Sequence, residues 1–187
     1  MGNLRLFWAL EIGAAARASA AGVAAALREQ PGGSDVRWVR EESLHVTLRF
    51  LGATDPARVA DLEREVGLAM RGTAPFSVSL AGAVLFPSAR RPRVVALALE
   101  PETELGTLAA RVERGTVAAG FPAEARAFRP HLTLGRARDR RGARLAVTAS
   151  VTAHGDAWDV TEIVLFRSDH APGGARYTPL ARVPLHP

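Results

Sequence analysis

Two short segments of the chain repeat the same pattern of side chains. The first, residues 43–50, reads Ser-Leu-His-Val-Thr-Leu-Arg-Phe, and the second, residues 129–136, reads Arg-Pro-His-Leu-Thr-Leu-Gly-Arg. Side chains alternate between the two faces of a β-strand, so the histidine and threonine of each segment share one face and the apolar residues share the other. The repeat therefore predicts two equivalent strands, each buried on one face and each presenting an imidazole beside a hydroxyl.

The histidines of the repeat, His45 and His131, are the candidate catalytic residues. A single histidine in such a strand is usually a satisfied polar residue, but packing gives no reason to place the same polar pair twice. If the two strands lie side by side or are related by a pseudo-twofold axis, both imidazoles face a common cleft. A histidine has an ordinary pKa of about 6.5, so such a pair can supply one base and one acid near neutral pH.

The remaining pattern predicts an α+β fold with mainly antiparallel sheets. Strands and helices are mixed without the regular alternation of a doubly wound sheet. Residues 143–149 are ambiguous between helix and strand, and Asp55 is the expected N-cap of the second helix, with Pro56 at its first position. We expect helices at 14–29, from 55 to about 70, and at 101–119, and strands at 4–12, 36–40, 44–51, 76–85, 93–99, 131–136, 162–167 and 177–184.

Composition excludes several kinds of chemistry. The chain has no cysteine, and all 24 of its basic residues are arginine, so thiolate and lysine nucleophiles, lysyl-nucleotide intermediates and a Walker-type phosphate loop are ruled out. A coding bias toward arginine is the favoured main cause of this composition, and a preference of arginine for phosphate can hold beside it. The 187 residues suit one domain or two packed lobes. No apolar run could span a membrane, and residues 1–12 resemble a first strand rather than a signal peptide.

A metal site is the main alternative interpretation of the histidines. Two histidines and two threonines offer few anionic ligands, whereas zinc normally takes three or four strong ones. His154, Asp156, Asp169 and His170 could contribute, but their spacing matches no metal motif. We therefore expect no metal and no other cofactor. A serine triad is also disfavoured, because the chain has no Gly-x-Ser-x-Gly elbow.

Residues next to the repeat could contact a phosphorylated substrate. The hydroxyls of Thr47 and Thr133 could donate to phosphate oxygens. Arg136 lies an odd number of residues from His131 and would point to the opposite face of a regular strand, unless Gly135 marks a bulge. Phe50 occupies the equivalent position in the first segment, where a core role is favoured over stacking on a base.

The paired His-apolar-Thr-apolar segments resemble those of the 2H phosphoesterase superfamily, and within it the RNA 2′,3′-cyclic phosphodiesterases, also called 2′-5′ RNA ligases. Residues 44–52 are similar to the first motif of this family and 128–136 to the second, while 5–10 and 160–180 resemble its first and C-terminal strands. The resemblance implies one bilobal domain over residues 1–187, with two pseudo-symmetric lobes, antiparallel sheets lining a central cleft and helices outside.

The resemblance also implies a reaction. The expected activity is hydrolysis of RNA 2′,3′-cyclic phosphate ends to 2′-phosphates, with reversible ATP-independent 2′-5′ ligation. His45 would be the proton donor and His131 the proton acceptor, and Thr47, Thr133 and Arg136 would bind the phosphate. The expected partner is RNA with a cyclic phosphate end, such as a tRNA half. The protein is expected to be a cytoplasmic monomer. The alternatives are a phosphodiesterase of small cyclic nucleotides and a non-catalytic RNA-binding module. A cluster of arginines at 136, 138, 140, 141 and 144 could guide the RNA backbone, although such a run of charges is more often merely solvated.

Overall fold

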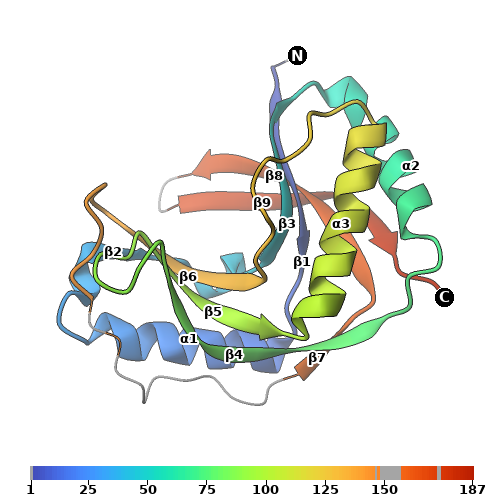
Figure 1. Cartoon of the computed structure of the whole chain (residues 1–187). Helices are drawn as coiled ribbons and strands as arrows, with labels where there is room; N and C mark the ends of the chain where they lie inside the picture. The colour runs from blue at the N-terminus through green and yellow to red at the C-terminus, as the bar shows by residue number, and fades with distance from the viewer. Residues whose placement is uncertain (1, 146, 148–156, 172–173) are drawn as a thin grey trace.

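Figure 1 shows the chain in a computed structural model that describes residues 2–145, 147, 157–171 and 174–187. The segment 143–149, which the sequence left open between helix and strand, lies partly outside the described residues. His154 and Asp156, two of the metal ligands considered above, also lie outside them. None of the described helices is long and apolar enough to cross a membrane.

The secondary structure is a mixture of strands and helices, as the sequence predicts. The described elements, in chain order, are β1 (Leu4–Leu10), α1 (Ala14–Arg28), η1 (Gly33–Asp35), β2 (Val36–Trp38), η2 (Glu41–Ser43), β3 (Val46–Thr54), η3 (Pro56–Arg58), α2 (Val59–Met70), β4 (Phe76–Phe86), β5 (Val94–Glu100), α3 (Glu102–Ala118), β6 (His131–Ala137), β7 (Ala157–Val160), β8 (Glu162–Ala171) and β9 (Gly174–Pro184).

Two elements differ from the prediction. The carboxylate of Asp55 does accept a hydrogen bond from the amide of Ala57, at 3.0 Å, but the turn that it caps is the short 3₁₀ helix η3, and α2 begins only at Val59. The strand β7 was not predicted as an element. It has only four residues and pairs with the edge of β4, so its signal is too short to stand out from irregular chain.

The strands form two antiparallel sheets, and each sheet contains one copy of the repeated segment. The strand order is β3-β1-β8-β9 in the four-stranded sheet and β2-β6-β5-β4-β7 in the five-stranded sheet. Residues 46–50 of the first segment lie on β3, with His45 directly before that strand, and residues 131–136 of the second segment lie on β6. The two copies therefore lie in separate sheets, which agrees with the two lobes that the family resemblance implies.

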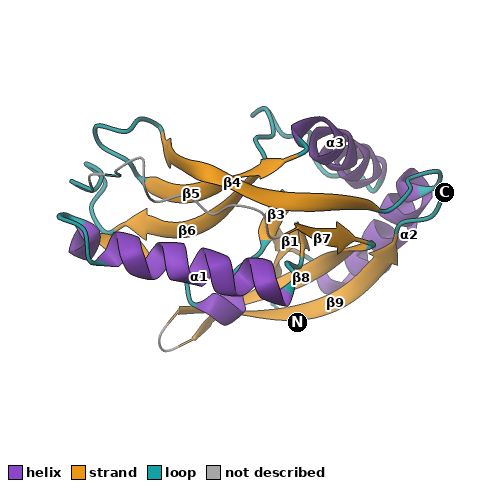
Figure 2. Ribbon diagram, turned by 90° about the horizontal axis from the view of Figure 1, so that it is seen from below, coloured by secondary structure: helices purple, strands orange, loops and turns teal. Residues whose placement is uncertain are grey.

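The helices pack on or beside the two sheets. Helix α1 packs along the five-stranded sheet, and α2 and α3 pack against each other beside the four-stranded sheet (Figure 2). The buried residues of α1 include Ala16, Ala20 and Leu27, which share one helical face. Gly115 of α3 permits the close approach of α2, since a Cβ at this position would lie 2.6 Å from the Cα of Val66.

Candidate active site

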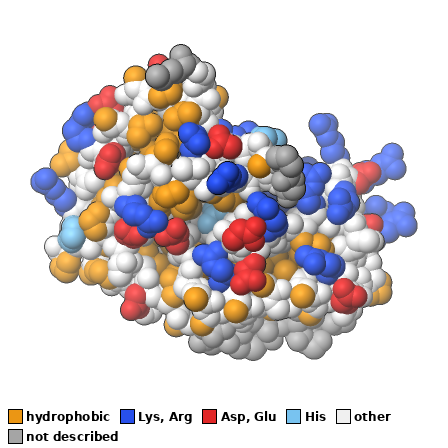
Figure 3. Space-filling view, turned by 180° about the vertical axis from the view of Figure 1, so that it is seen from behind, with side chains coloured by type: hydrophobic (Ala, Val, Ile, Leu, Met, Phe, Trp, Pro, Cys, Tyr) orange, Lys and Arg blue, Asp and Glu red, His pale blue; other side chains and the backbone are white. Residues whose placement is uncertain are grey.

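A cleft of about 1060 Å³ lies where the two sheets meet, and it contains both copies of the repeat. Residues of β3 and β6 line it, together with α3, the segment 124–129 and the β8–β9 hairpin. Figure 3 shows this face as hollowed, with arginine side chains around the hollow and a histidine visible inside it. The structure thus brings His45, Thr47, His131 and Thr133 into one site.

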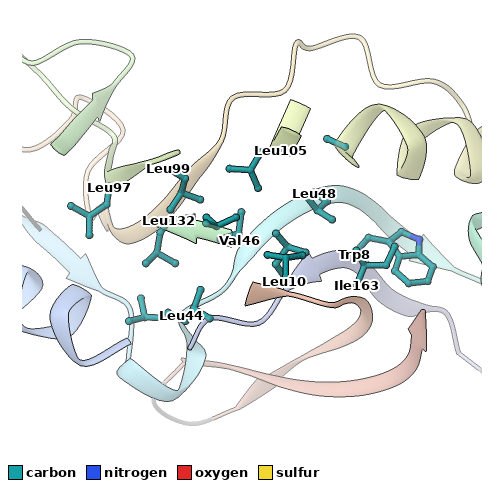
Figure 4. Close-up of a cluster of buried hydrophobic side chains, with 14 of the residues drawn as sticks. Trp8, Leu10, Leu44, Val46, Leu48, Leu97, Leu99, Leu105, Leu132 and Ile163 are labelled. Carbon is teal, nitrogen blue, oxygen red and sulfur yellow. The ribbon is translucent and has the colours of Figure 1, made fainter. Parts of the chain in front are cut away.

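The two faces of each motif strand differ as predicted. The apolar residues of the repeat are buried, with exposures of 0% for Val46 and Leu132 and 7% for Leu48. Figure 4 shows these three side chains in the core that joins the two lobes. The opposite face of each strand is left for the histidine and the threonine. The core thereby fixes the register that points both imidazoles into the cleft.

A β-bulge follows the threonine in both motif strands. Between β1 and β3, Trp8 is opposite Arg49 and Ala9 is opposite Thr47, so Leu48 has no partner. Between β5 and β6, Val95 is opposite Gly135 and Ala96 is opposite Thr133, so Leu134 has no partner. Each bulge shifts the alternation of side chains by one residue.

The bulges place Phe50 and Arg136 in the cleft. Both side chains line it on the same side of their strands as the histidine and threonine. The bulge that the sequence left open at Gly135 is therefore present, and it turns Arg136 toward the cleft. The favoured core position of Phe50 is wrong, because its side chain is 40% exposed. The bulge at Leu48 is the reason that Phe50 faces the cleft, and it could not be predicted because residues 43–50 contain no glycine to mark it.

The hydrogen bonds that the Nδ1 atoms of the two imidazoles make are equivalent. The Nδ1 atom of His45 lies 2.9 Å from the carbonyl oxygen of Ser43, and that of His131 lies 2.7 Å from the carbonyl oxygen of Arg129. Because a carbonyl oxygen can only accept, each Nδ1 carries a proton and each Nε2 is the atom that can gain or lose one. The Nε2 atom of His45 also lies 3.1 Å from the hydroxyl oxygen of Thr47.

Burial and nearby positive charges affect the protonation of His45. Burial lowers the pKa of His45 below its usual value of 6.5, the charges of Arg136 and His131 act in the same direction, and the hydrogen bond to the Ser43 carbonyl opposes them. In the ligand-free protein, His45 is therefore more often neutral at a given pH than an exposed histidine. An anion bound beside it would have the opposite effect on its pKa.

Aromatic residues that the sequence did not single out support both imidazoles. The His45 ring packs 4.9 Å from the ring of Phe7 and 4.9 Å from that of Tyr177, which meets it edge-on, and the His131 ring lies 5.3 Å from that of Phe86. Phe7 belongs to a second apolar cluster on the cleft side of the four-stranded sheet. The sequence feature that could have predicted this cluster is the uninterrupted apolar run of β1, which is typical of a strand buried on both faces.

Metal ligation finds no support among the described residues. No group of three or more histidine and acidic side chains lies close enough to hold a metal ion in this part of the chain. Of the ligands considered from the sequence, Asp169 forms an ion pair with Arg167 at 2.8 Å, and His170 lines the cleft.

An ion-pair network at the edge of the cleft connects the lobes. Arg49 is only 10% exposed; its Nε lies 2.6 Å from Glu113 Oε2 of α3, and its Nη1 lies 3.3 Å from Glu124 Oε2. The same guanidinium donates to the carbonyl oxygen of Pro122 at 2.6 Å. Arg49 therefore ties β3 to the segment that leads from α3 into His131.

Replacing Arg49 by Ala should lower the free energy of unfolding by about 2–3 kcal/mol, because it leaves the partly buried Glu113 carboxylate without a partner. The measurement is urea unfolding followed by circular dichroism. The matched control is Arg64→Ala, which removes an exposed pair with Asp61 and should have a much smaller effect. Equal midpoints for the two variants would show that the network does not stabilise the fold.

Comparison with known proteins agrees with this site. The family model described as LigT like Phosphoesterase matches residues 10–96 and 97–177, and each match contains one copy of the repeat. A fold of two such lobes, with one histidine motif from each facing a shared cleft, defines a phosphoesterase of the two-histidine class. The chain belongs to the LigT-like phosphoesterase family, and it is a hydrolase of that class.

Individual relatives support this membership. The chain is 33% identical over 150 residues to the RNA 2′,3′-cyclic phosphodiesterase of Methanothermobacter thermautotrophicus, covering 78% of this chain and 80% of that protein. It is 32% identical over 149 residues to the protein of the same name from Geobacillus stearothermophilus, covering 79% of this chain but only 47% of that longer protein. The crystal structure of E. coli LigT in its apo form has a TM-score of 0.81 and 30% identity, covering 99% of each chain.

Proposed function

We propose that this protein hydrolyses RNA ends that carry a 2′,3′-cyclic phosphate, leaving a 2′-phosphate, with His45 and His131 as its acid and base. The observation that carries the proposal is the equivalent pair of imidazoles, each with Nδ1 bound to a carbonyl oxygen and Nε2 free to exchange a proton in one cleft. The names of the curated relatives support the choice of substrate, and E. coli LigT has been crystallised with 3′-AMP.

The proposed reaction uses the two Nε2 atoms on opposite sides of the phosphorus. His131 accepts a proton from water as the water oxygen bonds to phosphorus. The bond between phosphorus and the 3′-oxygen breaks, and His45 donates a proton to that oxygen. The product is a 2′-phosphate beside a free 3′-hydroxyl, and one further proton exchange with solvent restores both imidazoles. A 5′-hydroxyl in place of water would give a 2′-5′ linkage, which is the proposed ligation.

The other polar residues of the cleft suit the charge that develops on the phosphate. The hydroxyls of Thr47 and Thr133 and the guanidinium of Arg136 can donate to the non-bridging oxygens. Phe50, exposed at the edge of the cleft, offers a ring on which the terminal base can stack once the guanidinium of Arg5, now 4.7 Å from the centre of that ring, moves aside.

The lowered pKa of His45 is compatible with a role as acid only when substrate is bound. In the free protein, burial favours the neutral imidazole. The cyclic phosphate brings a negative charge next to the ring, which favours the imidazolium form that the reaction requires. In this scheme the binding of substrate favours the protonated form of His45, which then acts as the acid.

The alternative activity is that of a phosphodiesterase of small cyclic nucleotides, and the length of the substrate separates it from the proposal. A phosphodiesterase of small cyclic nucleotides would turn over a cyclic mononucleotide as well as an oligonucleotide with the same end. The other alternative from the sequence, a non-catalytic RNA-binding module, would convert neither substrate and is disfavoured by the family to which the chain belongs. A strong preference for the oligonucleotide, with turnover, supports the proposed function.

We expect turnover without a divalent metal and without ATP, since two imidazoles and the phosphate-binding donors account for every proton transfer. The experiment is incubation of the protein with cyclic-phosphate RNA in EDTA, followed by chromatographic identification of the product. The expected product is the 2′-phosphate, at a rate within about twofold of that without EDTA. Loss of turnover in EDTA that zinc or magnesium restores would contradict the proposed mechanism.

A further inference from the structure

A second groove, of about 940 Å³, opens directly from the catalytic cleft on the side of the five-stranded sheet. Its lining includes six arginines and one acidic residue, Asp139. We call it the arginine groove and define it by Arg93, Arg126, Arg129, Arg136, Arg138 and Arg140. Three of these arginines, at positions 126, 129 and 136, also line the catalytic cleft, so the two hollows are continuous.

Most of the positive charge in this groove is not neutralised. Arg126 pairs with Glu124 at 3.3 Å, and Arg138 donates to the neutral carbonyl of Ser34. Within the described part of the chain, the other four arginines of the groove have no carboxylate within ion-pair distance. All six are exposed. Arginine side chains also gather over one side of the hollowed face in Figure 3.

The backbone of the sheet fixes where these arginines lie. Val94, the residue after Arg93, is paired with Arg136 in the register of β5 and β6. The carbonyl oxygen of Arg93 accepts from the amide of Ala137 at 2.9 Å, and the amide of Arg138 donates to the carbonyl oxygen of Asp35 at 2.8 Å. The charges of Arg93, Arg136 and Arg138 are therefore brought together by backbone pairing before any ligand binds, which is the arrangement that favours binding of an anion.

We infer that the arginine groove binds the phosphodiester backbone of the RNA strand on the 5′ side of the cyclic phosphate. This inference rests on the proposed function, because it takes the strand to end at the two imidazoles. Nucleotides beyond the end must leave the cleft, and the groove is a continuous exit lined by donors that suit phosphate. The β1–β3 side, with Phe50, is then left for the terminal base.

The inference changes the set of arginines expected from the sequence. Arg136, Arg138 and Arg140 line the groove, whereas Arg141 and Arg144 are not part of its lining. Arg93, Arg126 and Arg129 come from other segments of the chain and join the groove only through the fold. Arg93 and Arg140 line the groove but not the catalytic cleft, so we expect a mononucleotide held at the two imidazoles to make no contact with them.

The test compares the double variant Arg93→Ala/Arg140→Ala with the control Arg64→Ala/Arg71→Ala. Both lower the net charge by two, but the control arginines lie on or just after α2 and line neither hollow. The groove variant should lose about tenfold or more in kcat/KM for an RNA octanucleotide with a cyclic phosphate end, and less than about twofold for the cyclic mononucleotide. The control should lose little with either substrate.

Binding of the labelled octanucleotide at several salt concentrations gives an independent result. The slope of log affinity against log salt should become shallower by about 1.4 in the groove variant, since it removes two phosphate contacts and each contributes about 0.7 for single strands. Equal losses for octanucleotide and mononucleotide, or an unchanged salt slope, would overturn the inference. Failure of the unmodified protein to open either substrate would instead refute the proposed function, and the salt slope would still decide about the groove.

Discussion

Replacing His131 by Asn should lower kcat/KM on cyclic-phosphate RNA by about 10²- to 10⁴-fold, the usual contribution of one general acid–base group. The asparagine amide nitrogen lies where Nδ1 of the imidazole does, so it can still donate to the carbonyl of Arg129. What the substitution removes is Nε2, the atom that exchanges a proton in the proposed reaction. The same argument applies to His45→Asn and the carbonyl of Ser43.

Controls separate loss of chemistry from loss of structure. His186 is exposed near the C-terminus and does not line the cleft, so His186→Ala should keep full activity. Thermal unfolding of both asparagine variants should be close to that of the unmodified protein, because neither imidazole is part of the main core. An active His131→Asn variant would contradict the two-histidine mechanism.

The pH dependence of the unmodified protein provides a check on His45. As the acid, His45 must be protonated, so activity should fall as pH rises through its pKa. Burial lowers that pKa in the free protein, which places the descending limb of kcat/KM at lower pH than an ordinary histidine would. Bound phosphate raises the pKa, so the descending limb of kcat should lie at higher pH. Coincident limbs, or a descending limb that survives in His45→Asn, would contradict this assignment.

Local periodicity was sufficient to predict the motif strands. The alternation of His45, Val46 and Thr47 depends only on neighbours in the chain, and the structure has the faces as expected. The repeat also predicted two equivalent strands but left open whether they lie side by side in one sheet, and the structure places β3 and β6 in separate sheets. The positions after the threonines were harder, because a bulge is a property of a strand pair, and the partner strand is distant in sequence.

Long-range contacts could not be predicted from the sequence. Arg49 and Gly135 occupy equivalent positions, because each comes directly after the bulged leucine that follows the threonine of its motif. A Cβ at Gly135 would lie 2.5 Å from a methyl carbon of Val36, so β2 leaves no room for a side chain there. In the other lobe the equivalent position is open, and Arg49 uses it to reach Glu113. The same local pattern therefore has two different surroundings.

The pseudo-symmetry breaks at the next position as well. Phe50 and Arg136 occupy equivalent places after the two bulges, but one is aromatic and the other is cationic. The two sides of the cleft consequently differ in chemistry although their backbones correspond. We expect one side to suit a base and the other a phosphate, and the arginine groove continues the cationic side away from the cleft.

The division of labour between the histidines predicts a second large effect, seen with a substrate whose 3′-bridging oxygen is replaced by sulfur. A thiolate is a much better leaving group than an alkoxide and departs without a proton. If His45 is the acid, His45→Asn should recover most of the activity of the unmodified protein on the sulfur substrate, although it is impaired by about 10²- to 10⁴-fold on the oxygen substrate.

His131→Asn is the matched comparison. Attack by water still requires a base when the leaving group is sulfur, so this variant should remain about as impaired on the sulfur substrate as on the oxygen substrate. Rescue of His131→Asn alone would show that the roles of the two imidazoles are exchanged, with the buried His45 acting as the base that its lowered pKa in the free protein would suit. If neither variant is rescued, loss of the leaving-group proton is not what limits them, and the acid role of either histidine is refuted.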